Sequence, residues 1–176
     1  MSDPELTRPI KPRALPAQPI RIEPSSAERT ALAERFMISA LPEMVAEVCF
    51  EPKDDAVVAK GRLNATIIQP CAVTGEDLSY DVAEDFELRF VPQGQRQDHD
   101  EDEEFELALE DLDEIEYEGD SFDIGEAVAQ TLGLAIDPYR EGPGADAIRE
   151  TAGIESDENR KPDGPLAEAL AGLRKR

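Results

Sequence analysis

The chain has 176 residues, enough for one hydrophobic core, and a net charge of −23 from 41 acidic and 18 basic residues. Such a charge repels nucleic-acid phosphates and anionic membranes and attracts basic partners; alternatively, it serves only to keep the protein soluble and monomeric. No apolar run follows Met1, so we expect no signal peptide, and no stretch approaches the roughly 20 apolar residues of a membrane span. Two cysteines are too few for a disulfide framework, so we expect reduced thiols in a cytoplasmic, monomeric protein.

Prolines crowd the first 24 residues, and proline at this density precludes a regular helix. We therefore expect residues 1–24 to form an extended arm. Four apolar residues of the arm can still lie against a sheet: Ile10, Leu15, Ile20 and Ile22. Ser25 or Ser26 can cap a first helix. The helical spacing of the apolar residues predicts this helix at about residues 26–40, and Pro42 disfavours its continuation.

Three segments with a period of two follow, at about residues 44–50, 57–67 and 78–90. Their short connections predict an antiparallel meander. Cys49 alternates with apolar neighbours, and we expect it in the core. Glu84 is the one polar residue on the apolar face of the third segment, which suggests a bulge or bend there.

Residues 98–120 are strongly acidic, with fourteen Asp or Glu residues among 23. Within this linker, Ile115 and Tyr117 alternate with glutamates and predict one more short edge strand. The alternation of apolar and other residues at Phe105, Leu107 and Leu109 is less clear and gives weaker support for a strand.

A second helix is predicted after the acidic linker. Asp123 can accept the free amides of its first turn, and Glu126, three residues on, completes a capping-box pattern. Its apolar stripe reaches Ala135, and the helix is expected to stop before Asp137-Pro138. Beyond Glu141 we expect mobile chain, then a last short helix from Leu166 to about Leu173.

Together these elements predict an α+β fold: an antiparallel β-meander or partly closed sheet, packed by an N-terminal helix and a C-terminal helix, with disordered ends. The arm of residues 1–24 precedes a single domain at residues 25–145, which includes the acidic linker. Residues 146–176 form a flexible tail with the short terminal helix.

No catalytic residue, metal site or cofactor is expected. The sole histidine, His99, lies in a solvated run of charges without a nucleophile beside it. Asp98, Asp100 and Asp102 match three EF-hand ligand positions, but Glu103 replaces the required glycine and Leu109 the final glutamate. Two cysteines 22 residues apart and one distant histidine do not supply the four ligands of a structural zinc site.

The order of motifs resembles the YceD family, the large ribosomal RNA subunit accumulation proteins, over roughly residues 25–145. An Asp-hydrophobic-Gly-Glu helix entry and a Leu-Ala-x-Asp-Pro exit carry most of the resemblance. The motif residues are Cys71, Thr74, Gly75, Glu76, Asp123, Gly125, Glu126, Asp137 and Pro138. The continuation Pro143-Gly144-Ala145 is similar to the alphaproteobacterial branch. Many members carry a Cys-x-x-Cys pair where this chain has Cys71-x-x-Thr74, so a thiolate metal site or redox pair does not carry over.

The resemblance implies a non-enzymatic role in the accumulation of large-subunit (23S) rRNA and in ribosome biogenesis. Because of the charge, we expect the immediate partner to be a basic ribosomal protein or assembly factor, with rRNA contact weak or indirect. Its docking residues are expected in the linker: Asp98, Asp100, Glu101, Asp102, Glu103 and Glu104.

Two other functions compete with this one. The first is direct rRNA binding through the basic residues of the two ends: Arg8, Lys11, Arg13, Arg21, Arg174, Lys175 and Arg176. The second, weaker one is a hydrolase or nuclease, whose carboxylates would have to be fixed on rigid elements rather than in a linker.

Overall fold

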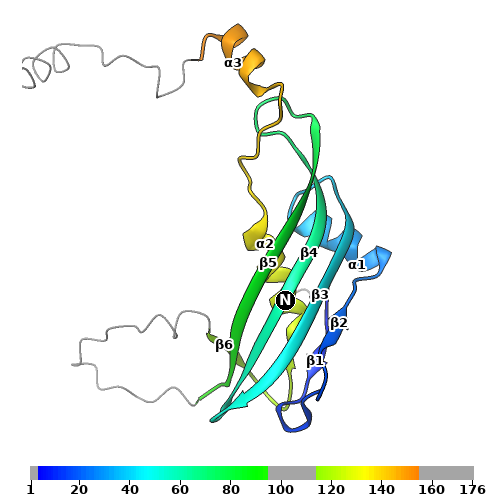
Figure 1. The fold of residues 1–176 in the computed structure, drawn as a ribbon, viewed down its shortest axis with the longest axis vertical. Coiled ribbons are helices and arrows are strands. Elements are labelled where there is room, and N and C mark those ends of the chain that lie inside the picture. The colour runs from blue at the N-terminus through cyan, green and yellow to red at the C-terminus, as the bar shows by residue number, and fades with distance from the viewer. Residues whose placement is uncertain (1–3, 95–113, 155–176) are drawn as a thin grey trace, which may run out of the picture.

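The computed structural model describes residues 4–94 and 114–154 as an α+β fold built on a mostly antiparallel sheet. Five strands lie in the order β2-β3-β4-β5-β6 (Figure 1). Their bounds are β2 Ile20–Ile22, β3 Ala40–Lys53, β4 Ala56–Pro70, β5 Asp77–Pro92 and β6 Glu114–Tyr117. The three long strands form the predicted antiparallel meander, whereas β6 pairs with β5 in parallel.

Three helices accompany the sheet: α1 Ser26–Arg35, α2 Ile124–Ala135 and α3 Ala145–Ala152. The ring of Phe36, directly after α1, approaches Gly133 so closely that a Cβ atom there would lie 2.7 Å from it. A short 3-10 helix, η1, spans Pro12–Ala14. Within the described residues, no helix has the length and apolar character needed to span a membrane.

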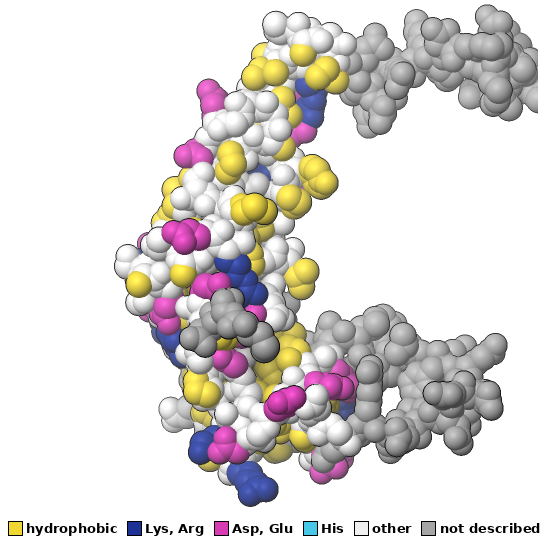
Figure 2. All heavy atoms as spheres, turned by 180° about the vertical axis from the view of Figure 1, so that it is seen from behind, with side chains coloured by type: hydrophobic (Ala, Val, Ile, Leu, Met, Phe, Trp, Pro, Cys, Tyr) yellow, Lys and Arg dark blue, Asp and Glu magenta, His cyan; other side chains and the backbone are white. Residues whose placement is uncertain are grey.

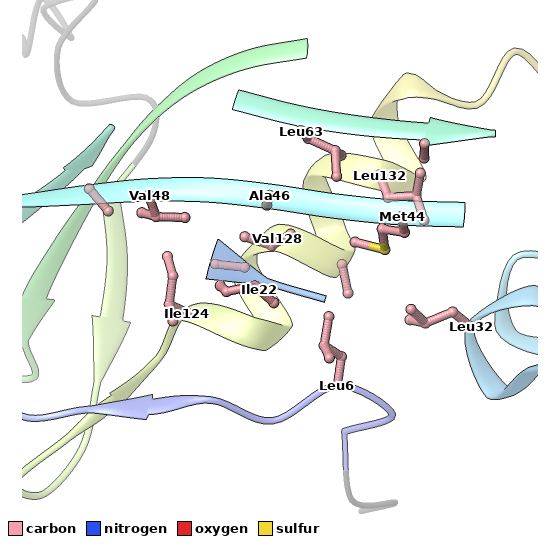
Figure 3. Close-up of a cluster of buried hydrophobic side chains, with 14 of the residues drawn as sticks. Leu6, Ile22, Leu32, Met44, Ala46, Val48, Leu63, Ile124, Val128 and Leu132 are labelled. Carbon is pink, nitrogen blue, oxygen red and sulfur yellow. The ribbon is translucent and has the colours of Figure 1, made fainter. Parts of the chain in front are cut away.

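The core lies between the sheet and α2. Period two in β3 and β4 and helical spacing in α2 place large apolar side chains on facing surfaces. Figure 3 shows them converging, with Leu6 and Leu32 closing one side. The labelled core residues are Leu6, Ile22, Leu32, Met44, Ala46, Val48, Leu63, Ile124, Val128 and Leu132, all nearly inaccessible to solvent.

The proline-rich N-terminal segment is extended, as predicted, and it is also part of the fold. Pro9–Ile10 form β1, which pairs with β7 (Phe122–Asp123), and Ile20–Ile22 add β2 to the edge of β3. Leu6 is completely buried. The strands formed by this segment are two and three residues long, because proline cannot donate to a ladder.

Four details differ from the sequence-based predictions. Helix α1 ends at Arg35 rather than near residue 40, because Met37 has a left-handed φ of 54° and β3 starts at Ala40. Cys49 is exposed, not in the core, since odd positions of β3 point away from α2. No bulge occurs at Glu84, which pairs in continuous register with Leu63. Finally, α3 forms at Ala145–Ala152, beyond Glu141, where we expected mobile chain.

Candidate functional site

The six acidic residues predicted to dock a partner, Asp98 and Asp100 to Glu104, lie outside the described residues, as do His99, the EF-hand-like stretch and the terminal helix. The structure therefore places only the family-motif residues. They form two groups, one at each end of α2, which is 12 residues and so about 18 Å long.

Cys71 to Glu76 form a compact turn between β4 and β5, which we call the thiol turn. The Cys71 N–H donates to the Glu76 carbonyl at 2.8 Å, and the Gly75 N–H donates to the Cys71 carbonyl at 2.9 Å. Gly75 has a φ of 73°, a left-handed conformation that glycine adopts without strain. The Glu76 N–H donates to the Thr74 hydroxyl at 3.1 Å. Two motif residues, Gly75 and Thr74, thus shape the turn itself.

The Cys71 thiol is buried, only 3% exposed, and it is surrounded by hydrogen-bond donors. Its Sγ accepts backbone N–H groups from Val73 (3.5 Å), Thr74 (3.4 Å) and Gly142 (3.3 Å). The Thr74 hydroxyl is the largest cause of a lowered pKa for Cys71, followed by the Thr74, Gly142 and Val73 amides, and the pKa falls to about 7. Donors stabilise the thiolate over the thiol. Thr74 therefore acts here as a donor to Cys71.

Residues 137–145, which we call the strap, run from the end of α2 across the thiol turn. The Ala72 N–H donates to the Arg140 carbonyl at 3.0 Å, and Gly142 reaches the Cys71 sulfur. A Cβ atom on Gly142 would lie 2.6 Å from the Leu78 side chain, so glycine permits this approach. Ala145, at the start of α3, is 2% exposed. The strap thereby fixes α3 near the β4–β5 end of the sheet (Figure 1).

A buried amide secures the other end of the strap. The Gln69 Nε2 donates to the Asp137 carbonyl at 2.7 Å, and its Oε1 accepts the Tyr80 hydroxyl at 2.5 Å. The Arg140 guanidinium lies 3.8 Å from the centre of the Tyr80 ring. Both polar groups of Gln69, which is 4% exposed, are therefore satisfied. Asp137 acts here through its backbone carbonyl and through its carboxylate, which accepts the Tyr139 N–H at 2.9 Å.

The entry of α2 is organised around Asp123. Its Oδ1 accepts the N–H groups of Gly125 (2.9 Å), Glu126 (3.3 Å) and, from the N-terminal segment, Arg8 (2.7 Å). The predicted cap is confirmed. The capping-box role of Glu126 is not seen, because Arg35 binds both of its carboxylate oxygens at 2.8 Å. A capping box does occur at α1, between Ser25 and Glu28.

Gly125 allows the N-terminal segment to cross the helix start. A Cβ atom there would lie 2.6 Å from the Leu6 carbonyl oxygen and 2.8 Å from the Arg8 nitrogen. Arg8 in turn pairs with Glu28 at 2.8 Å, and this hydrogen bond is the main reason why the pKa of Glu28 falls to about 2. Asp123 and Gly125 therefore dock residues 6–8 onto the start of α2, whereas Glu126 binds Arg35 of α1.

Sequence reasoning missed Gln69, Tyr80, Arg140 and Gly142 as parts of one cluster. The one available signal was Gln69, a polar residue on the buried face of β4. In the described parts of the chain, no group of three or more His, Cys, Asp or Glu side chains is arranged to hold a metal ion. The two groups of motif residues therefore hold both ends of α2 and the segments that extend from it.

The model of a protein family described as "Large ribosomal RNA subunit accumulation protein YceD" matches residues 59–174, well over half of the chain. The chain belongs to the YceD family. The matched range begins within β4 and includes the thiol turn, α2, the strap and α3. No curated protein and no solved structure matches the chain. The family assignment confirms the resemblance seen in the sequence, and its description ties the family to accumulation of the large-subunit ribosomal RNA.

Proposed function

We propose that this YceD-family protein supports accumulation of large-subunit rRNA by binding a basic ribosomal protein or assembly factor, without catalysing a reaction. It acts in the cytoplasm as a monomer, and its immediate partner is protein rather than RNA. Two features support the proposal: the family's description and the net charge of −23. The choice of a protein partner over RNA depends on how the basic side chains are used.

Three of the four basic residues of the N-terminal segment are paired with carboxylates, and this observation carries the proposal. Arg8 pairs with Glu28 at 2.8 Å, Lys11 with Asp120 at 3.2 Å, and Arg21 with Glu23 at 3.3 Å. Exposed pairs of this kind add little stability, but each one cancels a local positive charge. Of the four, only Arg13 has no ion pair among the described residues, so a phosphate backbone would find little uncompensated positive charge there.

The arginines that line a groove of about 770 Å³, on the sheet face away from α2, also lie beside carboxylates. Two arginines line it, Arg21 and Arg29, together with Glu23, Glu43 and Asp81. The Arg29 Nη1 already donates to the Pro24 carbonyl at 2.8 Å. Acidic groups thus accompany the cations of the groove, which supports a protein partner over direct rRNA binding through the N-terminal segment.

The deciding experiment neutralises the acidic linker without changing side-chain size. Asp→Asn and Glu→Gln replacements are made at Asp98, Asp100, Glu101, Asp102, Glu103 and Glu104. A control variant carries six isosteric replacements of exposed carboxylates outside the linker: Glu34, Glu43, Glu51, Asp54, Asp55 and Glu150. Both variants are used to capture partners from native lysate at low salt, with and without RNase, and to complement a deletion strain.

We expect the linker variant to capture several-fold less basic protein and to lower 23S rRNA levels, while the control variant and RNase treatment leave capture unchanged. Two results would contradict the proposal: equal capture by both variants, or purified rRNA binding to the protein alone with a steep salt dependence. The second result would favour direct RNA binding.

A further inference from the structure

The outer edge of β5 carries no strand along most of its length in the described residues. On its other side, β5 pairs with β4 from Asp77 to Phe90. On the outer side, β6 pairs only with residues 89–92, so it lies beside one end of β5 (Figure 1). At the other end, Arg140 of the strap lies over the Tyr80 ring. Residues 81–88 remain as an open edge, with backbone N–H and C=O groups available to another strand.

The two faces of this open edge differ sharply in chemistry. Toward α2 it presents Val82, Phe86 and Leu88, each only half-buried. Hydrophobic side chains are likewise visible at several places along the molecule when it is viewed from behind (Figure 2). On the opposite face the edge presents its exposed acidic residues: Asp81, Asp85 and Glu87. A strand laid beside residues 81–88 would meet apolar groups on one face and carboxylates on the other.

Glu84 adds a carboxylate to the apolar face. It lies opposite the completely buried Leu63 yet is itself exposed, and it forms no ion pair within the described part of the chain. Asp85 and Glu87 do have partners, Arg62 at 3.5 Å and Lys60 at 3.4 Å, but these side chains are 76% and 63% exposed and are weakly held. An inward-pointing charge on an edge strand opposes pairing with apolar or acidic strands.

The charges decide which strand fits. A second copy of β5 would bring Asp81, Asp85 and Glu87 near the same acidic residues, and like charges on neighbouring strands are destabilising. A strand with Lys or Arg at alternate positions would instead pair with them, while its apolar residues cover Val82, Phe86 and Leu88.

We propose that the β5 edge at residues 81–88 is a docking site for an extended segment of a basic protein, with alternating apolar and Lys or Arg residues, which adds a strand to the sheet. The inference rests on the proposed function for the basic nature of the partner and adds the place and the mode of binding. Backbone hydrogen bonds provide the attachment, and Glu84 selects a basic residue on the apolar side.

The test uses the full-length chain and three synthetic ten-residue peptides: alternating Val-Lys, alternating Val-Glu, and five Lys followed by five Val. Binding is measured by fluorescence anisotropy at low salt, and amide hydrogen exchange locates the site. We expect the Val-Lys peptide to bind and to slow exchange of the amides within residues 81–88 that point away from β4. The block peptide should bind about tenfold more weakly, and the Val-Glu peptide should not bind.

A matched pair of variants tests the role of Glu84. A fourth peptide carries Lys in place of one central Val of the Val-Lys peptide, so that one basic residue lies on the apolar side and can face Glu84. Glu84→Lys should weaken binding of this peptide about tenfold, and Glu84→Gln by less, since only one charge pair is lost rather than inverted. Glu34→Lys on α1 makes the same charge change at an exposed position and should leave affinity within about twofold. Thermal unfolding of each variant establishes that it folds.

Three results would overturn the inference. They are protection of amides outside β5, equal loss of affinity in Glu84→Lys and Glu34→Lys, and outward amides of residues 81–88 that are already protected in the free protein. The last result would mean that the chain itself or a second copy covers the edge. Should Glu84→Lys capture the cellular basic partner normally while the linker variant does not, the proposed function would stand and the β5 edge would be excluded.

Discussion

The two ends of α2 are held by different chemistry. At its entry, the Asp123 carboxylate accepts three backbone N–H groups. Ion pairs link the N-terminal segment to α1 (Arg8 with Glu28, Glu5 with Arg35) and α1 to α2 (Arg35 with Glu126). At its exit, neutral groups dominate, namely the Gln69 amide, the Tyr80 hydroxyl and the Cys71 thiol.

The two ends of α2 differ in which part of the fold would open if their contacts were broken. The entry closes on Leu6, a fully buried side chain, so opening it would expose part of the core. The exit holds the strap and α3 through hydrogen bonds and a few contacts, and α3 buries only Ala145. We therefore expect changes at the entry to affect global stability, and changes at the exit to affect the local order of the strap.

The largest expected effect is at Gly125. Gly125→Ala would place Cβ 2.6 Å from the Leu6 carbonyl oxygen, and because this neighbour is backbone it cannot move cheaply. We expect a loss of about 3 kcal/mol in the free energy of unfolding, measured by urea denaturation. Gly133→Ala on the same helix meets only the movable ring of Phe36 and should change stability by less than about 1 kcal/mol. Similar losses of stability in both variants would contradict the interpretation that the backbone contact at the entry of α2 is rigid.

Asp123→Ala comes next. A cap alone costs about 1 kcal/mol, but Asp123 also holds the Arg8 amide, so we expect about 2 kcal/mol. Asp123→Asn keeps an acceptor oxygen and should retain most of this stability, as measured by thermal and urea unfolding. Activity in a complementation assay should fall only as far as folding does. An Asp123→Ala protein with wild-type stability but no activity would make Asp123 a binding residue instead.

The smallest effect is confined to the exit and concerns a pKa. In a Cys49→Ser background, the absorbance of the Cys71 thiolate at 240 nm should titrate with a midpoint of about 7. The folded pKa lies below the ordinary value of 9.0, so the thiolate stabilises the fold fully above pH 9 and this contribution is lost as the pH falls to about 7. Thr74→Val removes the largest cause and should raise the midpoint. A titration curve identical in both proteins would exclude the Thr74 hydroxyl as a donor.

Much of the fold was predictable because its signals are local. Period two identified β3, β4 and β5, and even the four-residue β6, because alternation survives among the glutamates around Ile115 and Tyr117. The cap at Asp123 and the apolar stripe identified α2. The same period of two places Cys49 on the outward face, because it lies at an odd position of β3. Its apolar neighbours Val48 and Phe50 led instead to the prediction of a core residue.

The sequence by itself determined which segments become strands and helices and which of their faces are apolar, because those properties depend on neighbours a few residues away. Only the tertiary structure decided that Leu6 belongs to the core, that β6 runs parallel to β5, and that Gln69, Cys71 and Arg140 meet at the strap. These contacts join residues far apart in the chain, and no local periodicity encodes them. They form because each buried amide, carbonyl and thiol has to find a partner once water is excluded.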